Sequence, residues 1–411
     1  MQPMTHASTA SVPRWLLAAL CLAACAAAAS AQNLTRFTSR FYEVFTDLPA
    51  NEVRPIAGHM DLVYAEYGNR FKEFPAKNSQ PVRLYVYSTR EAYTQGLKKK
   101  GIDATGSGGM FFASSQEAGL ATFVEGHSSV EMYHLLQHEG FHQFAHLRLG
   151  RGLPQWTNEG LAEYFGQSVL VKGKLRMGVA PESRIQGLAL AVRSKVVFPF
   201  KEMLEMTNEA WNEKLRKGDK RAGLMYDQAW AMTHFLIHGD KGLYTAAFAN
   251  FIKLTSQGKT GEQAFKEAFG PDATPELFQA AWEKYLQNDW EPDGVSTALA
   301  RLDFLADGAA LLTEKGIMVS SMGELKRELQ GRQFRRTRFI DGVITEESAQ
   351  DHTLFDPPPK DDPRKPTSIE VKPSGKPKVP PSITIKGLSV EIRLTWVVKQ
   401  GAEPRSVIEF R

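Results

Sequence analysis

The stretch HLLQHEGFHQFAH, residues 134–146, constrains the fold more than any other part of the chain. Four of its residues are histidines at intervals of four: His134, His138, His142 and His146. Residues four apart lie on neighbouring parts of one helix face. Most other positions nearby are apolar: Tyr133, Leu136, Phe141, Phe144 and Leu147. The pattern therefore predicts a helix buried in a large domain.

Only the central histidine pair has an acid where metal chemistry needs one. HEGFH places His138 and His142 on one helix face, where two imidazoles can bind one zinc ion. Glu139 follows the first histidine and can take a proton from water at the metal. The outer pairs have a leucine or a glutamine at that position. Each four-residue step also rotates the side chain by about 40°, so His134 and His146 cannot both face the same ion.

A catalytic zinc site has three protein ligands and keeps a position for water, so a third ligand must lie nearby. The candidate is Glu159, in LPQWTNEGLAEYF (153–165). Two glycines and a proline just before it predict a helical hairpin that brings Glu159 back to the histidines. Glu163 faces the same way and is placed to accept a hydrogen bond from a ligand imidazole. The alternative is a pair of surface carboxylates.

HEGFH followed by WTNEGLAEYF resembles the gluzincin zinc metallopeptidases, the clan of thermolysin-like and aminopeptidase M-like enzymes. The sequence looks most like uncharacterised exported bacterial members of that clan. The resemblance implies that His138, His142 and Glu159 bind zinc and that Glu139 is the catalytic base. It also implies a mainly helical, thermolysin-like zinc domain.

Relatives in this clan place a tyrosine over the oxyanion of the tetrahedral intermediate, at a comparable distance after the ligand glutamate. The resemblance implies this role for Tyr226, in LMYDQAWAMTHFL. A packed helix tyrosine is the alternative interpretation, and His234 is an alternative donor. The clan's aminopeptidases also capture the substrate amine with a glutamate in a G-x-M-E-N edge strand. Here the stretch is GGMFFA (108–113), so aminopeptidase action is not expected, although such a strand can pair with an extended peptide.

The first 31 residues predict an export signal. Arg14 precedes the apolar run WLLAALCLAACAAAA, and Ala29-Ser30-Ala31 forms a small-residue cleavage site. One alternative is a lipoprotein signal, in which LAAC makes Cys25 the lipidated first residue; another is a retained apolar helix. Both cysteines lie in this segment, so the mature chain is expected to have no disulfide. We therefore expect a periplasmic or extracellular protein whose only membrane link would be a lipid on Cys25.

The order of the expected elements predicts an α+β fold, with a small N-terminal β-sheet followed by a helical body. Strands are expected at 40–47, 81–87, 106–114 and 120–126. Helices are expected at 51–71, 90–99, 129–148, 155–170, 184–195, 199–206, 225–238, 242–255, 260–268 and 275–287.

The predicted domain boundaries follow changes in composition. A gluzincin-like domain is expected at 32–290 and a helical, basic extension at 291–355, in which RQFRRTRF (332–339) is interpreted as a solvated face. Prolines and lysines predict a semi-rigid linker at 356–382. Residues 383–411 alternate like two or three strands, a small β-rich appendage too short to fold alone.

These patterns predict a zinc-dependent hydrolase, most simply a peptidase acting on a peptide or protein. Two alternatives stay open: a non-hydrolytic cell-envelope protein that keeps the metallopeptidase frame for binding or scaffolding, and a hydrolase of a non-peptide amide. A net charge of +4 over 411 residues gives no case for nucleic acid as a partner. Cleavage specificity, endopeptidase or exopeptidase action and oligomeric state are not predicted, because they depend on scattered surface residues.

Overall fold

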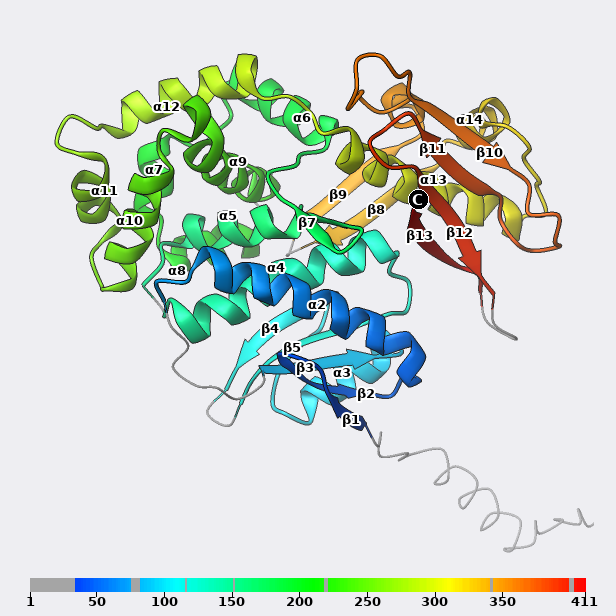
Figure 1. The fold of residues 1–411 in the computed structure, drawn as a ribbon, viewed down its shortest axis with the longest axis horizontal. Coiled ribbons are helices and arrows are strands. Elements are labelled where there is room, and N and C mark those ends of the chain that lie inside the picture. The colour runs from blue at the N-terminus through cyan, green and yellow to red at the C-terminus, as the bar shows by residue number, and fades with distance from the viewer. Residues whose placement is uncertain are drawn as a thin grey trace, which may run out of the picture.

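The computed structural model describes residues 34–74, 82–114, 117–150, 152–217, 221–340, 343–398 and 403–411. The predicted export signal, residues 1–31 with Cys25, lies outside this part of the chain. Within it, no helix combines the length and the hydropathy needed to cross a bilayer. The predicted α+β class is confirmed, because an N-terminal sheet, a helical body and a C-terminal sheet follow one another (Figure 1).

The N-terminal sheet has five strands in the order β1-β2-β3-β5-β4. They are β1 (Thr35–Thr38), β2 (Tyr42–Thr46), β3 (Val82–Tyr87), β4 (Gly109–Ala113) and β5 (Ala118–Phe123). The three central strands run parallel and are connected through α2 (Ala50–Arg70) and α3 (Arg90–Lys98). β4 pairs antiparallel with β5 and forms an edge of the sheet, where it contacts α4 (Ser129–Arg148).

Helices cover both faces of this sheet (Figure 1). Along β3, Leu84 and Val86 lie in the core that α2 and α4 share, whereas Tyr85 and Tyr87 lie in a separate core under α3. Successive side chains of a strand point to opposite faces, so a strand covered on both sides is apolar throughout. The LYVY run at the end of β3 fits this requirement, since all four of its residues are buried.

The helical body follows α4 and includes one small β-hairpin. Its helices are α5 (Gln155–Gly166), α6 (Glu182–Arg193), α7 (Phe200–Glu205), α8 (Asn208–Arg216), α9 (Ala222–Gly242), α10 (Thr245–Ser256), α11 (Gly261–Phe269), α12 (Pro275–Lys284) and the π-helical turn η1 (Tyr285–Asp289). The hairpin consists of β6 (Val169–Val171) and β7 (Lys174–Arg176). The sequence patterns missed α8 and β1, which are short elements with few apolar positions. They also missed the hairpin, because the helix expected at 155–170 ran into the apolar β6, whereas α5 ends at Gly166.

α5 lies in close contact with α9, and Gly160 permits this packing. A Cβ atom at Gly160 would lie 2.4 Å from the carbonyl oxygen of Ala229 and 2.3 Å from the hydroxyl of Thr233. Both distances are far below van der Waals contact, so no larger residue fits without a shift of one helix. The glycine that follows Glu159 therefore sets the depth at which that carboxylate is held.

The C-terminal region combines helices and strands around a second core. It contains α13 (Gly294–Glu314), α14 (Met322–Gly331), β8 (Arg335–Ile340), β9 (Val343–Ser348), the 3-10 turn η2 (His352–Phe355), β10 (Ser368–Lys372), β11 (Ser382–Lys386), β12 (Ile392–Val397) and β13 (Arg405–Phe410). Strands β10 to β13 form an antiparallel sheet in sequence order. Apolar residues of this sheet pack with α13 and α14, and Val169 and Val179 of the helical body join the same core.

The predicted linker at 356–382 is wrong for part of its length. Residues Ser368–Lys372 form β10, and the side chain of Val371 is buried in the second core. The SIEVK sequence between the prolines alternates like a strand, and pairing with β11 outweighs the surrounding proline content. The predicted two or three strands of the C-terminal segment are confirmed as β11, β12 and β13, and β10 from the predicted linker adds a fourth strand to their sheet.

The basic segment 332–339 is also not simply a solvated face. Arg336, on β8, is buried and its guanidinium bonds to the carboxylates of Asp303 and Asp307 on α13, each at 2.9 Å. A third carboxylate, on Glu347 of β9, accepts from the same side chain. Burial of a charge requires such partners, so this arginine ties the β8–β9 hairpin to α13.

Candidate metal centre

A helical hairpin of α4 and α5 carries the predicted metal ligands. The hydroxyl of Ser128 accepts a hydrogen bond from the N–H of Glu131 and caps the start of α4. Gly150 adopts a positive φ of 83° just beyond the end of α4, and Pro154 directly precedes α5. The predicted turn between the two helices is therefore confirmed, and it brings Glu159 to the histidine face of α4.

Three potential donor atoms form a small, buried triangle. The Nε2 atoms of His138 and His142 lie 3.0 Å apart. Oε2 of Glu159 lies 3.4 Å from Nε2 of His138 and 3.3 Å from Nε2 of His142. His138 and Glu159 are buried and His142 is partly buried. Among the described residues, this is the one group of three or more such side chains close enough to share a metal ion.

The donor set and its spacing fit zinc. Zinc binds imidazole nitrogen and carboxylate oxygen at about 2.0–2.2 Å. Tetrahedral angles then place neighbouring ligand atoms about 3.3 Å apart, close to all three edges of the triangle. Gln155, one turn before Glu159 on α5, donates from Nε2 to Oε1 of that glutamate at 2.8 Å. This bond holds the carboxylate with its other oxygen directed at the two histidines.

Glu139 is held by the edge of the N-terminal sheet. The backbone N–H of Phe111, on β4, donates to Oε2 of Glu139 at 2.7 Å. The negative charge of Glu139 helps to raise the pKa of His142, after the larger effect of Glu159, so this contact fixes an ionisable oxygen near the triangle. The edge strand predicted from GGMFFA therefore lies next to the candidate base, where an extended peptide could also pair with it.

A chain of alternating charges supports the far side of His138. Nδ1 of His138 lies 3.1 Å from Oε1 of Glu163, and Oε2 of Glu163 lies 2.7 Å from a terminal guanidinium nitrogen of Arg184. Nε of Arg184 lies 2.6 Å from Oδ1 of Asp227. A carboxylate at this position favours the tautomer with its proton on Nδ1, which leaves the Nε2 lone pair available for a metal. Glu163 lies where it was expected, and its role as support for a metal ligand stays a prediction.

Sequence patterns gave no signal for Arg184 or Asp227, which come from α6 and α9. Both belong to segments with ordinary helical spacing, and only the packing of α9 on α5 and of α6 on α9 brings them to Glu163. Gln155 was also missed, although its four-residue spacing from Glu159 was a usable signal.

The charges shift the pKa values of the site in opposite directions. Burial raises the pKa of Glu159, but the charges and hydrogen bonds of His142 and His138 outweigh burial and lower it to about 2. Burial lowers the pKa of His142, and Glu159 outweighs it, so that pKa is raised above its usual value. Burial raises the pKa of Glu163, but the charge of Arg184 outweighs burial and holds that pKa well below its usual range. Both glutamates are therefore carboxylates at neutral pH.

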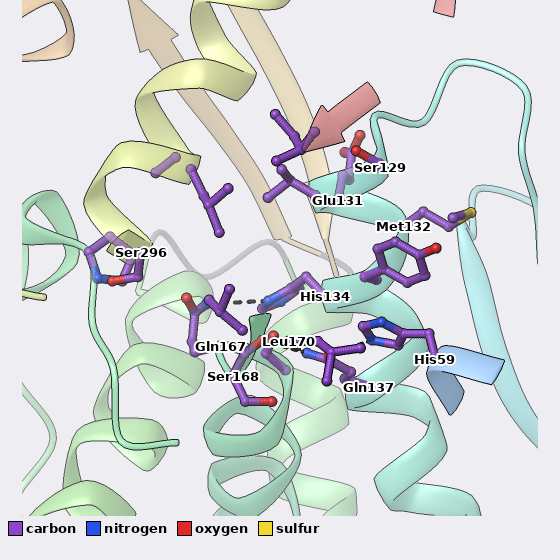
Figure 2. Close-up of a pocket in the computed structure, with 18 of the residues that line it drawn as sticks. His59, Ser129, Glu131, Met132, His134, Gln137, Gln167, Ser168, Leu170 and Ser296 are labelled. Atoms are coloured by element: carbon purple, nitrogen blue, oxygen red, sulfur yellow. Dashed lines mark hydrogen bonds between the residues drawn. The ribbon is translucent and has the colours of Figure 1, made fainter. Parts of the chain in front are cut away.

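The two outer histidines lie apart from the triangle. Nδ1 of His134 lies 3.4 Å from Nε2 of Gln167, on the wall of a cavity (Figure 2). The ring of His146 packs against Phe111 with 5.3 Å between centroids. The helical rotation along α4 thus separates them from each other and from the central pair, as the four-residue spacing predicted.

Tyr226 is not part of the triangle. It lies on α9, packs edge-on against Trp211 with 5.3 Å between ring centroids, and lines the same cavity as Glu163 and His134. Its role at an oxyanion stays a prediction. His234 is a structural residue, because its ring nitrogens lie 3.0 Å from the hydroxyl of Tyr285 and 3.0 Å from the carbonyl oxygen of Gly178.

A comparison with known protein families found a match that includes the donor triangle. A family model described as a protein of unknown function (DUF1570) matches residues 134–260. The matched segment begins at His134 and ends at Thr260, the capping residue of α11, so it contains the donor triangle and Glu163. The C-terminal sheet lies outside it. No curated protein matches the sequence.

Proposed function

We propose that this protein is a zinc-dependent hydrolase of the gluzincin type that cleaves peptide bonds. The observation that carries the proposal is the triangle of His138, His142 and Glu159, with edges of 3.0, 3.4 and 3.3 Å. Glu139 is close enough for its charge to act on His142. Metal binding alone does not require an adjacent base, and Glu139 is therefore the feature that favours hydrolysis over scaffolding.

Zinc held by these three residues would supply Lewis acidity for the scissile carbonyl and for the attacking water. Glu139 accepts the proton that the water loses and can return it to the leaving amine. The N–H of Phe111 keeps one oxygen of Glu139 fixed at 2.7 Å. A base that is already oriented loses little freedom as the reaction proceeds.

Neighbouring side chains orient the ligands in this proposal. Glu163 fixes the tautomer of His138, and Gln155 fixes the rotamer of Glu159. Tyr226 is the proposed donor to the oxyanion of the tetrahedral intermediate, a role that rests on the gluzincin resemblance. The pattern of residues 1–31 supports export, so we place the activity outside the cytoplasm.

The proposal is tested by metal analysis and cleavage profiling on the purified mature chain. We expect one zinc per chain, and cleavage of peptides in an unbiased library that is lost in Glu139→Gln and after chelation. Absence of stoichiometric zinc would refute the whole proposal. A zinc-loaded protein whose cellular role survives Glu139→Gln would instead support a scaffold built on the same frame.

A further inference from the structure

A cavity of about 740 Å³ lies between the N-terminal half of α4 and the C-terminal sheet. Its volume is within the range of about 300–1,000 Å³ that is usual for ligand sites. Apolar side chains come from elements far apart in sequence: Ile56, Val130, Tyr133, Leu170, Leu299 and Val407. Polar side chains labelled in Figure 2, among them His134, Gln167 and Ser296, lie between them.

The cavity reaches to within one side chain of the candidate metal centre. Glu163 is part of its wall and also contacts Nδ1 of His138 at 3.1 Å. His134 is another part of the wall, and its ring centroid lies 6.5 Å from that of His138. The cavity therefore lies on the Nδ1 side of His138, opposite the Nε2 atom of the donor triangle, and the two sites share Glu163.

An edge of β13 faces the cavity. Four consecutive residues, 405–408, line it. Neighbouring side chains of a strand point to opposite faces, so a cavity against one face would be lined by every second residue. Lining by consecutive residues indicates that the strand presents its edge. Among the described residues, β13 is the last strand of its sheet and pairs with β12 alone.

The register shows which backbone groups this edge offers. The N–H groups of Glu391 and Arg411 each donate to the other residue's carbonyl oxygen. Bonded and non-bonded pairs alternate along an antiparallel ladder. Pairs 393–409, 395–407 and 397–405 therefore hold β12 and β13 together. The N–H and C=O groups of Ser406, Ile408 and Phe410 point away from β12.

We propose that this cavity binds an extended, apolar segment of the peptide substrate as an additional strand on β13. The inference rests on the proposed peptidase function and assigns the C-terminal sheet to its substrate site. Regularly spaced N–H and C=O groups match a peptide backbone, and apolar walls accept its side chains. A strand edge offers nothing comparable to an acyl chain, so a peptide is favoured over a lipid.

The test selects peptides without requiring cleavage. An unbiased library of ten-residue peptides is applied to the zinc-loaded Glu139→Gln protein, and retained peptides are identified by mass spectrometry. In that background, Ser406→Pro removes one outward N–H, whereas Ser406→Ala keeps it. We expect Glu139→Gln to retain peptides rich in Val, Leu and Phe. Ser406→Pro should weaken their binding about 3- to 10-fold, the effect of one backbone hydrogen bond, and Ser406→Ala should not.

A second variant pair addresses the cavity without altering β13. Ala300, on α13, lines the cavity, and Ala310, on the same helix, does not. Ala300→Phe should fill part of the cavity and weaken binding of the retained peptides about tenfold or more, while Ala310→Phe should leave it within about twofold. Thermal unfolding identifies any variant that fails to fold. If one variant pair is lost in this way, the other pair still tests whether peptides bind in the cavity.

Several outcomes would overturn the proposal. These are no retained peptide, equal retention by Ser406→Pro and Ser406→Ala, or equal retention by Ala300→Phe and Ala310→Phe. Palmitate binding that Ala300→Phe abolishes, with peptide retention unchanged, would assign the cavity to a lipid. Failure of the proposed function looks different: the wild-type protein would cleave none of the peptides that Glu139→Gln retains.

Discussion

The candidate metal centre and the cavity both border α4, but they are built differently. The centre draws its donor atoms from one helical hairpin, with His138 and Glu159 both buried. The cavity is assembled from α2, α4, the β6 segment, α13 and the C-terminal sheet, and its wall mixes apolar and polar side chains. Glu163 belongs to both, since it contacts His138 and lines the cavity.

The two proposed roles, chemistry at the centre and substrate selection in the cavity, fit this difference in construction. Metal ligation needs donor atoms within a few tenths of an ångström, which a rigid hairpin with closely packed helices can supply. Selection among substrates needs a larger surface, which can come from any part of the fold. The matched family segment covers residues 134–260, so three elements of the cavity wall, α2, α13 and the C-terminal sheet, lie outside it.

The largest expected effect is on zinc binding at the centre. Removing one of three ligands, by His138→Ala or His142→Ala, should abolish stoichiometric zinc binding in a metal assay after dialysis. His134→Ala and His146→Ala, on the same helix, should leave zinc content unchanged because neither ring is in the triangle. Equal zinc loss from all four variants would show that zinc binding depends on an intact α4 rather than on His138 and His142 as ligands.

The next effect is on catalysis without metal loss. Glu139→Gln keeps the size of the side chain and can still receive the hydrogen bond from Phe111. It removes the base, so kcat should fall about 10²- to 10⁴-fold with zinc content unchanged. Wild-type turnover by this variant would rule out Glu139 as the base.

Tyr226 tests whether a residue on the cavity wall also acts at the centre. Tyr226→Phe keeps the ring packed on Trp211 and removes only the hydroxyl. Loss of an oxyanion donor should lower kcat about 10²-fold with little change in KM. If KM rises instead and kcat is retained, Tyr226 belongs to substrate binding in the cavity.

Glu163 joins the two regions, and its replacement should have an intermediate effect. Glu163→Gln can still accept from His138 but leaves Arg184 without one of its two carboxylate partners. Zinc affinity should fall about 10- to 100-fold, measured by competition with a chelator. Glu182→Gln, on α6 but outside the chain from His138 to Asp227, is the matched control and should keep wild-type affinity.

The contrast between a site built from one hairpin and a site built from distant elements also explains which residues the sequence could predict. The centre depends on spacings of four residues and one tight turn, and such local patterns identified all three proposed ligands, Glu139 and Glu163. Arg184 and Asp227 meet Glu163 only through the packing of separate helices, which no local pattern encodes. β10 was missed because SIEVK is a short alternating stretch between prolines, and its pairing partner lies beyond them.

The smallest expected effect concerns stability of the centre as pH changes, measured with zinc removed by chelator. The pKa of Glu159 is lowered to about 2, so its stabilising contribution is present above its usual pKa and is lost as pH falls towards 2. The pKa of His142 is raised above its usual 6.5, so its contribution is present below that value and declines as pH rises through the folded-state pKa.

The free energy of unfolding should therefore fall on either side of a maximum between about pH 4.5 and 6.5, by on the order of 1–2 kcal/mol. Glu159→Gln should flatten this profile, because both shifts depend on its charge. An unchanged profile in that variant would show that the two groups do not interact in solution.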